Sequence, residues 1–335
     1  MRRKRLPAGN PKARIMPRLR IKHLTTYTYS QPMAFGEHRL MVRPRDSHDL
    51  RLVSAELRIV PVPTLRWIHD PFGNSVTIAE FSEMSTELSF ESEILIERYP
   101  DDTTSLEIEP YAQSLPFNYL DTELPDLAPA IARRDSDPYG IVDLWALGFT
   151  APGGPTDTLS LLIRMTESIK QDFTYMAREA VGVQTAAETL NLRSGTCRDY
   201  ALLMMEAVRS LGIAAHFVTG YLYDPALDTG DNGSGGGSGG GNGGGNVGGN
   251  SGGSMDSGAP TLGAGATHAW CEVYLPGLGW ISFDPTNGRY GSEDLIRIGI
   301  ARAPEQAQPL SGLLNGDPST ALGMDVQVSV TREEV

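Results

Sequence analysis

The sequence predicts an α+β protein, in which an N-terminal antiparallel β-sandwich domain precedes a domain that packs a cysteine-bearing helix on a second antiparallel sheet. Apolar and polar residues alternate between residues 19 and 96, with turn residues between the runs, which is typical of antiparallel strands. From residue 159 apolar residues recur at helical spacing, and alternating runs return after residue 212. We place a disordered basic tail at 1–16, the β-domain at 17–103 and the second domain at 104–335.

Short strands in series define the β-domain. The first strand carries alternate residues on one face and ends at the Gln31-Pro32 break; these residues are Leu19, Ile21, His23, Thr25, Tyr27 and Tyr29. Further strands are expected at Val53–Ile59, Thr64–Ile68 and Leu88–Ile96, with a turn at Asp70–Asn74. The histidines of this region share no common spacing, so we interpret them as structural or surface residues; they are His23, His38, His48 and His69.

Helical patterns open the second domain after a connector rich in Pro and acidic residues. Helices are expected at Leu159–Ile169, at Thr185–Leu190 and from Cys197 to Leu211, where Gly212 ends the last one. Ile213–Tyr223 is predicted to be a buried strand, and Met324–Val330 alternates like a final strand that returns to the sheet.

Residues 230–258 are almost entirely Gly, Ser and Asn. Such a segment buries no apolar surface to offset the entropy of ordering, so we predict a disordered loop. A tolerated surface insertion is the favoured interpretation, and a mobile lid over the site is the alternative. A phosphate-binding loop is disfavoured because no Lys-Ser/Thr ending or helix start follows.

The charge distribution argues against nucleic-acid and membrane partners for the folded domains. The chain has 28 basic and 41 acidic residues, a net charge of −13, and eight of the basic residues lie in the first twenty positions. The remainder carries about −21, which repels nucleic acid and anionic membranes. The basic tail itself is interpreted as a polyanion-binding segment, a disordered leader or a mis-assigned start, with Met16 as the other candidate first residue.

The apolar segments and the cysteines of the chain predict its localisation. No apolar run reaches the roughly 18 residues that span a bilayer, and the N-terminus lacks the apolar stretch of a secretory signal. Two distant cysteines do not form a disulfide framework. We therefore expect a soluble, reduced, cytoplasmic protein.

Cys197 is the candidate nucleophile. Thr196 and Asp199 fit the capping-box pattern, which makes Thr196 the helix cap and Cys197 the first helical residue. Unpaired backbone N–H groups at a helix start favour a thiolate, and a nearby imidazolium lowers the thiol pKa further. A buried, inert cysteine is the alternative, which the glycine and polar neighbours disfavour.

His268 and Asp284 are the candidate base and orienting acid. They lie on two successive predicted strands. If Tyr274 pairs with Trp280, or with a residue two positions away, Asp284 lies on the face of His268 and within two positions of opposite it. Side chains so placed reach each other, and the same parity sends Cys271 to the other face and into the core.

Zinc is the competing interpretation of a Cys, His and Asp set. Structural zinc sites use closely spaced ligand pairs such as C-x-x-C, and the sequence has none. We predict neither a metal nor a cofactor, and we interpret Tyr200, His216 and Glu272 as structural residues.

These motifs resemble the transglutaminase-like branch of the papain-like cysteine enzymes, in the bacterial form with an N-terminal β-domain. The resemblance extends from Leu19 to about Val330 and is most specific at Ser194–Tyr200, Thr267–Trp270 and Gly279–Pro285. It implies a papain-like/transglutaminase-like core, so that residues 104–335 form the catalytic domain. It also implies that Cys197 is the nucleophile, His268 the general base and acid, and Asp284 the residue that orients the imidazole.

The predicted activity is cysteine-dependent acyl transfer on peptide or protein amides, as in a transglutaminase-like cysteine protease, an amidase or a protein-glutamine acyltransferase. Water or an amine resolves the thioester, and the sequence leaves open the choice between hydrolysis and transamidation. The alternative is a catalytically silent transglutaminase-fold binding or scaffold protein. A further hypothesis is that the protein works beside peptide-ligating or peptide-modifying enzymes, as related bacterial proteins do.

Overall fold

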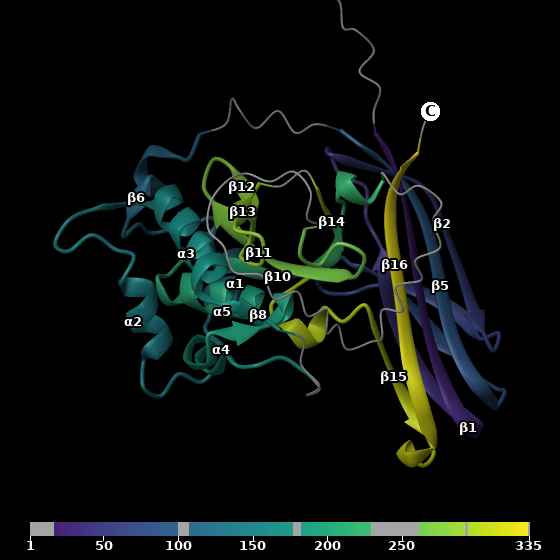
Figure 1. The fold of residues 1–335 in the computed structure, drawn as a ribbon. Helices are drawn as coiled ribbons and strands as arrows, with labels where there is room; N and C mark the ends of the chain where they lie inside the picture. Colours follow the sequence, from purple (N-terminus) through teal and green to yellow (C-terminus); the bar gives the residue numbers. More distant parts are fainter. Residues whose placement is uncertain (1–16, 100–106, 177–181, 229–260, 292–293, 334–335) are drawn as a thin grey trace, which may run out of the picture.

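Two antiparallel sheets and a layer of helices make up the protein (Figure 1). The computed structural model describes residues 17–99, 107–176, 182–228, 261–291 and 294–333. The predicted basic tail at 1–16 and the predicted glycine-rich loop at 230–258 lie outside these residues.

The first sheet is organised by β1, Arg18–Arg43, which has partners on both of its edges. Its first half lies between β5 and β16, and its second half contacts β4 and β15. The other strands of this sheet are β2 Leu50–Val60, β3 Thr64–His69, β4 Ser75–Glu80, β5 Ser85–Arg98, β15 Leu310–Asn315 and β16 Ala321–Glu333. The α+β prediction with an N-terminal antiparallel β-domain is confirmed, and this domain is built as one curled sheet that β1 runs through (Figure 1).

The predicted end of the first strand at Gln31-Pro32 is wrong, because β1 continues to Arg43. The pairing of β1 with β5 shifts register between Thr28 and Met33, so Pro32 sits at an irregularity of the ladder. Proline lacks a backbone N–H and is tolerated in strands at such places.

The second sheet has the order β13-β12-β11-β10-β14, and α5 packs on β10 and β11 (Figure 1). Its strands are β10 Ala215–Leu222, β11 Thr267–Leu275, β12 Gly279–Asp284, β13 Arg289–Tyr290 and β14 Leu295–Ala301. The helices are α1 Leu124–Ile131, α2 Ile141–Leu147, α3 Thr158–Asp172, α4 Ala186–Leu192 and α5 Cys197–Ser210. Two short strand pairs complete this half, namely β6 Ser114–Leu115 with β7 Thr156–Asp157, and β8 Thr174–Tyr175 with β9 Ser194–Gly195.

The two halves share an apolar core. Ile21 and Ile96 of the first sheet pack in one buried cluster with Tyr221 and Ile296 of the second. The turn before β4 also contacts β14, because the Asn74 side chain donates to the carbonyl of Ile300 and accepts from its N–H, at 2.6 and 2.9 Å.

The C-terminal strands β15 and β16 pair with β1 of the first sheet. The predicted boundaries place these residues in the second domain, whereas the alternation at Met324–Val330 predicted their return to a sheet. Long-range pairing explains the difference, because a strand pattern does not identify its partner.

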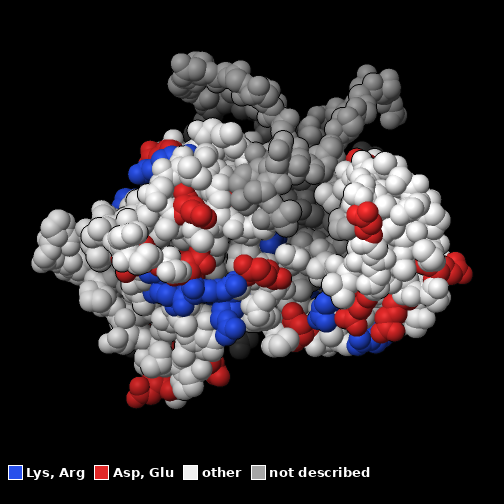
Figure 2. Space-filling model, turned by 90° about the horizontal axis from the view of Figure 1, so that it is seen from below, with Lys and Arg blue, Asp and Glu red and all other residues white. Residues whose placement is uncertain are grey.

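On the face shown in Figure 2, acidic and basic side chains lie next to one another on both lobes. Elsewhere in the structure too, charged side chains form ion pairs at the surface, for example Arg66 with Glu37 at 2.9 Å and Arg134 with Glu305. None of the helices in the described ranges is both long and apolar enough to cross a membrane.

Candidate active site

Cys197 begins α5, and a buried carboxylate fixes this helix start. The Thr196 backbone N–H and hydroxyl donate to Asp199 Oδ2 at 2.8 and 2.9 Å, and Asp199 Oδ1 accepts from the Gln184 N–H at 2.7 Å. Asp199 is fully buried, and a Cβ at Gly195 would lie only 2.9 Å from Asp199 Cβ. The predicted helix start is confirmed, and it places Cys197 at the positive, N-terminal end of the α5 dipole.

The register of β11 and β12 agrees with the parity argument. Tyr274 lies opposite Trp280, and Cys271 lies opposite Phe283 in the core that α5 covers. Cys271 is fully buried, as predicted. Asp284 therefore projects from the sheet face that also carries His268.

His268 and Asp284 are hydrogen-bonded to each other. His268 Nε2 lies 2.9 Å from Asp284 Oδ2, and both side chains are buried. Asp284 also accepts from Asn287 Nδ2 at 2.7 Å and from the Thr286 N–H at 3.0 Å. Since Asp284 occupies Nε2, Nδ1 is the ring nitrogen left for the Cys197 thiol.

The three side chains stabilise one another's charged forms. Burial raises the pKa of the Cys197 thiol, but the neighbouring His268 imidazolium, followed by the charge of Arg198, lowers it below its ordinary value. Burial lowers the pKa of His268, whereas the charge and hydrogen bond of Asp284 and the contact with Cys197 raise it to about 10. Burial raises the pKa of Asp284, but the charge and hydrogen bond of His268 outweigh this effect and lower the pKa below its ordinary value. The site thus favours a thiolate beside an imidazolium at neutral pH.

Tyr175 is a site residue that the sequence reasoning missed. β8 pairs with β9 so that Tyr175 lies opposite Gly195, two residues before the nucleophile. Burial, followed by the charge and hydrogen bond of the Cys197 thiolate, raises the pKa of Tyr175. The hydroxyl therefore stays protonated at neutral pH. No local pattern marks this residue, because a two-residue strand has no periodicity.

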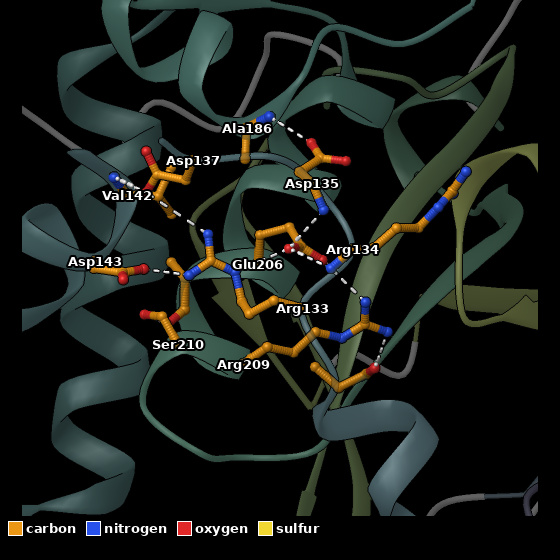
Figure 3. Close-up of polar contacts among 12 residues, drawn as sticks. Arg133, Arg134, Asp135, Asp137, Val142, Asp143, Ala186, Glu206, Arg209 and Ser210 are labelled. Carbon is orange, nitrogen blue, oxygen red and sulfur yellow. Dashed lines mark hydrogen bonds and ion pairs between the residues drawn. The ribbon is translucent and has the colours of Figure 1, made fainter. Parts of the chain in front are cut away.

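A buried charge cluster holds α5 in place (Figure 3). Glu206 Oε2 accepts from Arg133 Nε at 3.0 Å and from the backbone N–H groups of Arg134 and Asp135 at 3.1 and 3.2 Å. Glu206 Oε1 accepts from Arg209 Nη1 at 3.0 Å, and neither of these two side chains is exposed. The segment before α2 is thereby fixed to the helix that carries the nucleophile.

A cavity of about 420 Å³ lies between the 45–50 loop and the second sheet. Trp270 and Glu272 of β11 line it, together with Trp280 of β12. Glu272 is buried and pairs with Arg297 at 3.2 Å. Trp270, Glu272 and Trp280 project from the same face of the sheet as His268, so the cavity runs along the face that carries the His268–Asp284 pair. Within the described ranges, no three His, Cys, Asp or Glu side chains are grouped to hold a metal ion.

A thiol at a helix start, packed against a sheet that supplies a histidine and a carboxylate, defines a transglutaminase-like protein. Sequence comparison gives the same class for both halves. Residues 19–97 match the bacterial transglutaminase-like N-terminal region, and residues 148–285 match the transglutaminase-like superfamily. The chain belongs to the bacterial transglutaminase-like proteins.

Several mycobacterial proteins are similar over nearly the whole chain. Rv2569c of Mycobacterium tuberculosis is 26% identical over 324 residues, which cover 93% of this chain and 92% of the relative. ML0607 of Mycobacterium leprae is 24% identical and covers 95% and 99%, respectively; both are described as uncharacterized. Among solved structures, a candidate cysteine protease from Cytophaga hutchinsonii matches with a TM-score of 0.65 and 18% identity, over 96% of this chain and 92% of its own. This likeness shows the shared fold.

Proposed function

We propose that the protein is a cysteine-dependent acyl-transfer enzyme that acts on peptide or protein amides. The supporting observation is the His268–Asp284 hydrogen bond of 2.9 Å, which leaves the other imidazole nitrogen for a thiol of lowered pKa at the start of α5. A nucleophile, a base and an orienting acid in this arrangement suit attack on a carbonyl carbon.

In the proposed reaction, the Cys197 thiolate attacks the amide carbonyl and forms a tetrahedral oxyanion. The Cys197 backbone N–H donates to this oxyanion. The His268 imidazolium then protonates the leaving amine from Nδ1, and the C–N bond breaks to give a thioester. Neutral His268 takes a proton from the incoming water or amine, which displaces the thiolate. Water yields a carboxylic acid, and an amine yields a new amide.

Alkylation by iodoacetamide tests this proposal without a known substrate. The rate at Cys197 is measured from acid to alkaline pH by peptide mapping, and the buried Cys271 serves as internal control. We expect rapid labelling of Cys197 well below pH 8, with a midpoint that rises in His268→Ala and stays unchanged in His69→Ala, which alters an exposed histidine of the β-domain. Labelling only at alkaline pH, and unaffected by His268→Ala, would instead favour a catalytically silent scaffold.

Turnover is tested with glutamine-containing peptides and a labelled primary amine. Mass spectrometry distinguishes peptide-bond cleavage, side-chain deamidation and amine incorporation. Cys197→Ala should abolish all three while the protein remains folded. Activity that persists in Cys197→Ala contradicts the assigned nucleophile.

The proposal includes a reducing compartment, because a thiolate nucleophile must stay unoxidised. Cys197 and Cys271 are both free thiols. Cell fractionation with an antibody against the chain tests the cytoplasmic assignment, which recovery from another compartment contradicts.

A further inference from the structure

The segment Thr261–Ala266 lies against the catalytic pair and is called the strap here. It directly precedes β11, the strand that carries His268. The side chains that hold the strap, Asp224 and Asn287, do not themselves take part in the proposed reaction.

Gly263 of the strap lies beside His268 Nδ1, the ring nitrogen that Asp284 leaves without a hydrogen-bond partner. Its φ of +89° is a conformation that favours glycine, and a Cβ added there would lie 2.5 Å from His268 Nδ1 and 3.1 Å from Cε1. Cys197 is 6% exposed and His268 1% exposed. A peptide strand needs a spacing of about 4.7 Å from its neighbour, so a substrate amide does not fit between Gly263 and Nδ1.

Three contacts hold the strap. The Thr261 N–H donates to Asp224 Oδ2 at 2.6 Å, and the carbonyl of Leu262 accepts from Asn287 Nδ2 at 3.1 Å. Ala264 packs against the apolar cluster that contains Trp270.

Asn287 connects the strap to the catalytic carboxylate. The same Nδ2 that donates to Leu262 also donates to Asp284 Oδ2 at 2.7 Å. An amide nitrogen has two N–H donors, so one holds the strap while the other holds the acid.

We propose that the strap is a cover that must leave His268 before a substrate enters, and that Asn287 is the positioning residue that couples this cover to Asp284. The part that concerns substrate rests on the proposed function, whereas access to the thiol does not. In the covered state the strap shields Nδ1 and admits only small reagents to the thiol. When the strap leaves, Asn287 keeps its contact with Asp284 and its second N–H becomes available to water or substrate.

The experiment compares two thiol reagents on the full chain, namely iodoacetamide and a maleimide that carries a polyethylene glycol chain. Asp224→Ala removes the contact to Thr261 outside the catalytic triad. Asp228→Ala is the matched control, because this nearby carboxylate accepts from the Tyr223 hydroxyl and the Arg332 N–H instead. Loss of a hydrogen bond to a charged group should raise the maleimide rate at Cys197, relative to iodoacetamide, about tenfold or more in Asp224→Ala alone.

Gly263→Ala reaches the open state by a second route, since the added methyl group displaces the strap from Nδ1. We expect the same rise in relative maleimide rate. Equal rate ratios in the wild type, Asp224→Ala and Gly263→Ala overturn the cover, as does a wild-type ratio already as high as that of the reduced, unfolded chain.

Asn287→Ala distinguishes coupling from simple anchoring. It should raise the relative maleimide rate and also move the midpoint of the iodoacetamide pH profile upward, because Asp284 loses a donor and stabilises the imidazolium less. Asp224→Ala should leave that midpoint unchanged. An unmoved midpoint in Asn287→Ala overturns the positioning role, provided that thermal unfolding shows both variants to be folded.

The outcomes also separate this inference from the proposed function. Labelling needs no turnover, so a rise in maleimide access without any amide reaction supports the cover and contradicts the enzyme. Amide turnover with unchanged rate ratios supports the enzyme and contradicts the cover.

Discussion

Replacing Glu206 by alanine tests how strongly the buried charge cluster supports the helix of the nucleophile. Arg209 has no exposed side-chain surface, and among the interactions described above Glu206 is its only anionic hydrogen-bond partner. Its other hydrogen bonds go to backbone carbonyls, such as those of Ala130 and Ala215. Glu206→Ala leaves this guanidinium without its counter-charge. It also removes the acceptor for the N–H groups of Arg134 and Asp135.

Breaking a buried ion pair by removing one partner costs about 3–5 kcal/mol. At about 2–4 °C per kcal/mol for a protein of some 150–250 residues, and somewhat less for a larger one, the melting temperature should fall by at least about 5 °C. The double variant Glu206→Leu with Arg209→Met removes both charges of the pair. Its loss in free energy of unfolding should be clearly smaller than the sum of the losses in Glu206→Leu and Arg209→Met alone, because neither partner is left as an unpaired charge.

Urea unfolding followed by circular dichroism measures these free energies, and the iodoacetamide rate at Cys197 reports on the helix start. We expect Glu206→Ala to unfold at lower urea concentration. A loss below about 1 kcal/mol, or additive single and double variants, would refute the reasoning that the pair is electrostatically coupled and supports α5.

Three further changes give expected outcomes. Asp284→Asn should lower the neutral-pH alkylation rate of Cys197. In the wild type, the stabilisation from the raised His268 pKa is full below about pH 6.5 and is lost as the pH rises through about 10, whereas that from the lowered Cys197 pKa is full only above about pH 8.5. The free energy of unfolding of the wild type in urea should therefore fall between about pH 8.5 and 10, and Asp284→Asn should not show this fall. Gly220→Ala should cost about 1–3 kcal/mol or more in urea unfolding, because its Cβ would lie 2.1 Å from the Ile296 carbonyl oxygen and force β10 away from β14; an unchanged midpoint contradicts this packing. Asn74→Ala should cost about 1–3 kcal/mol because both backbone groups of Ile300 lose a partner, whereas Asn315→Ala, on β15, is the comparison that should cost less.

Features with a local cause could be predicted from the sequence. The cap at Thr196 follows from residues three positions apart, and the shared face of His268 and Asp284 follows from strand parity across a short turn. Both depend on spacing along a few residues, where the geometry of a helix turn or a hairpin is fixed.

Features that depend on distant partners could not be predicted. From the sequence, a charged residue such as Glu206 on a helix is expected to face solvent. The segment 133–135, which covers it, lies about seventy residues earlier in the chain. Tyr175 is brought next to Gly195, just before the nucleophile, by a parallel strand pair too short to show a pattern. The strap and its contacts to Asp224 and Asn287 likewise bring together residues from three separate parts of the chain.

The central position of β1 has a consequence for the order of assembly. Arg20 of β1 and Glu333 of β16 pair although 313 residues separate them, so β1 obtains this partner only after β16 has been synthesised. Until then one edge of β1 is an open template for another chain, and such distant pairing slows folding. Val330 of β16 packs with Ile296 and Ile298 of β14, so the sheet that bears His268 is fully supported only at that moment. A chain that lacks β16 therefore carries its thiol on an incompletely supported sheet.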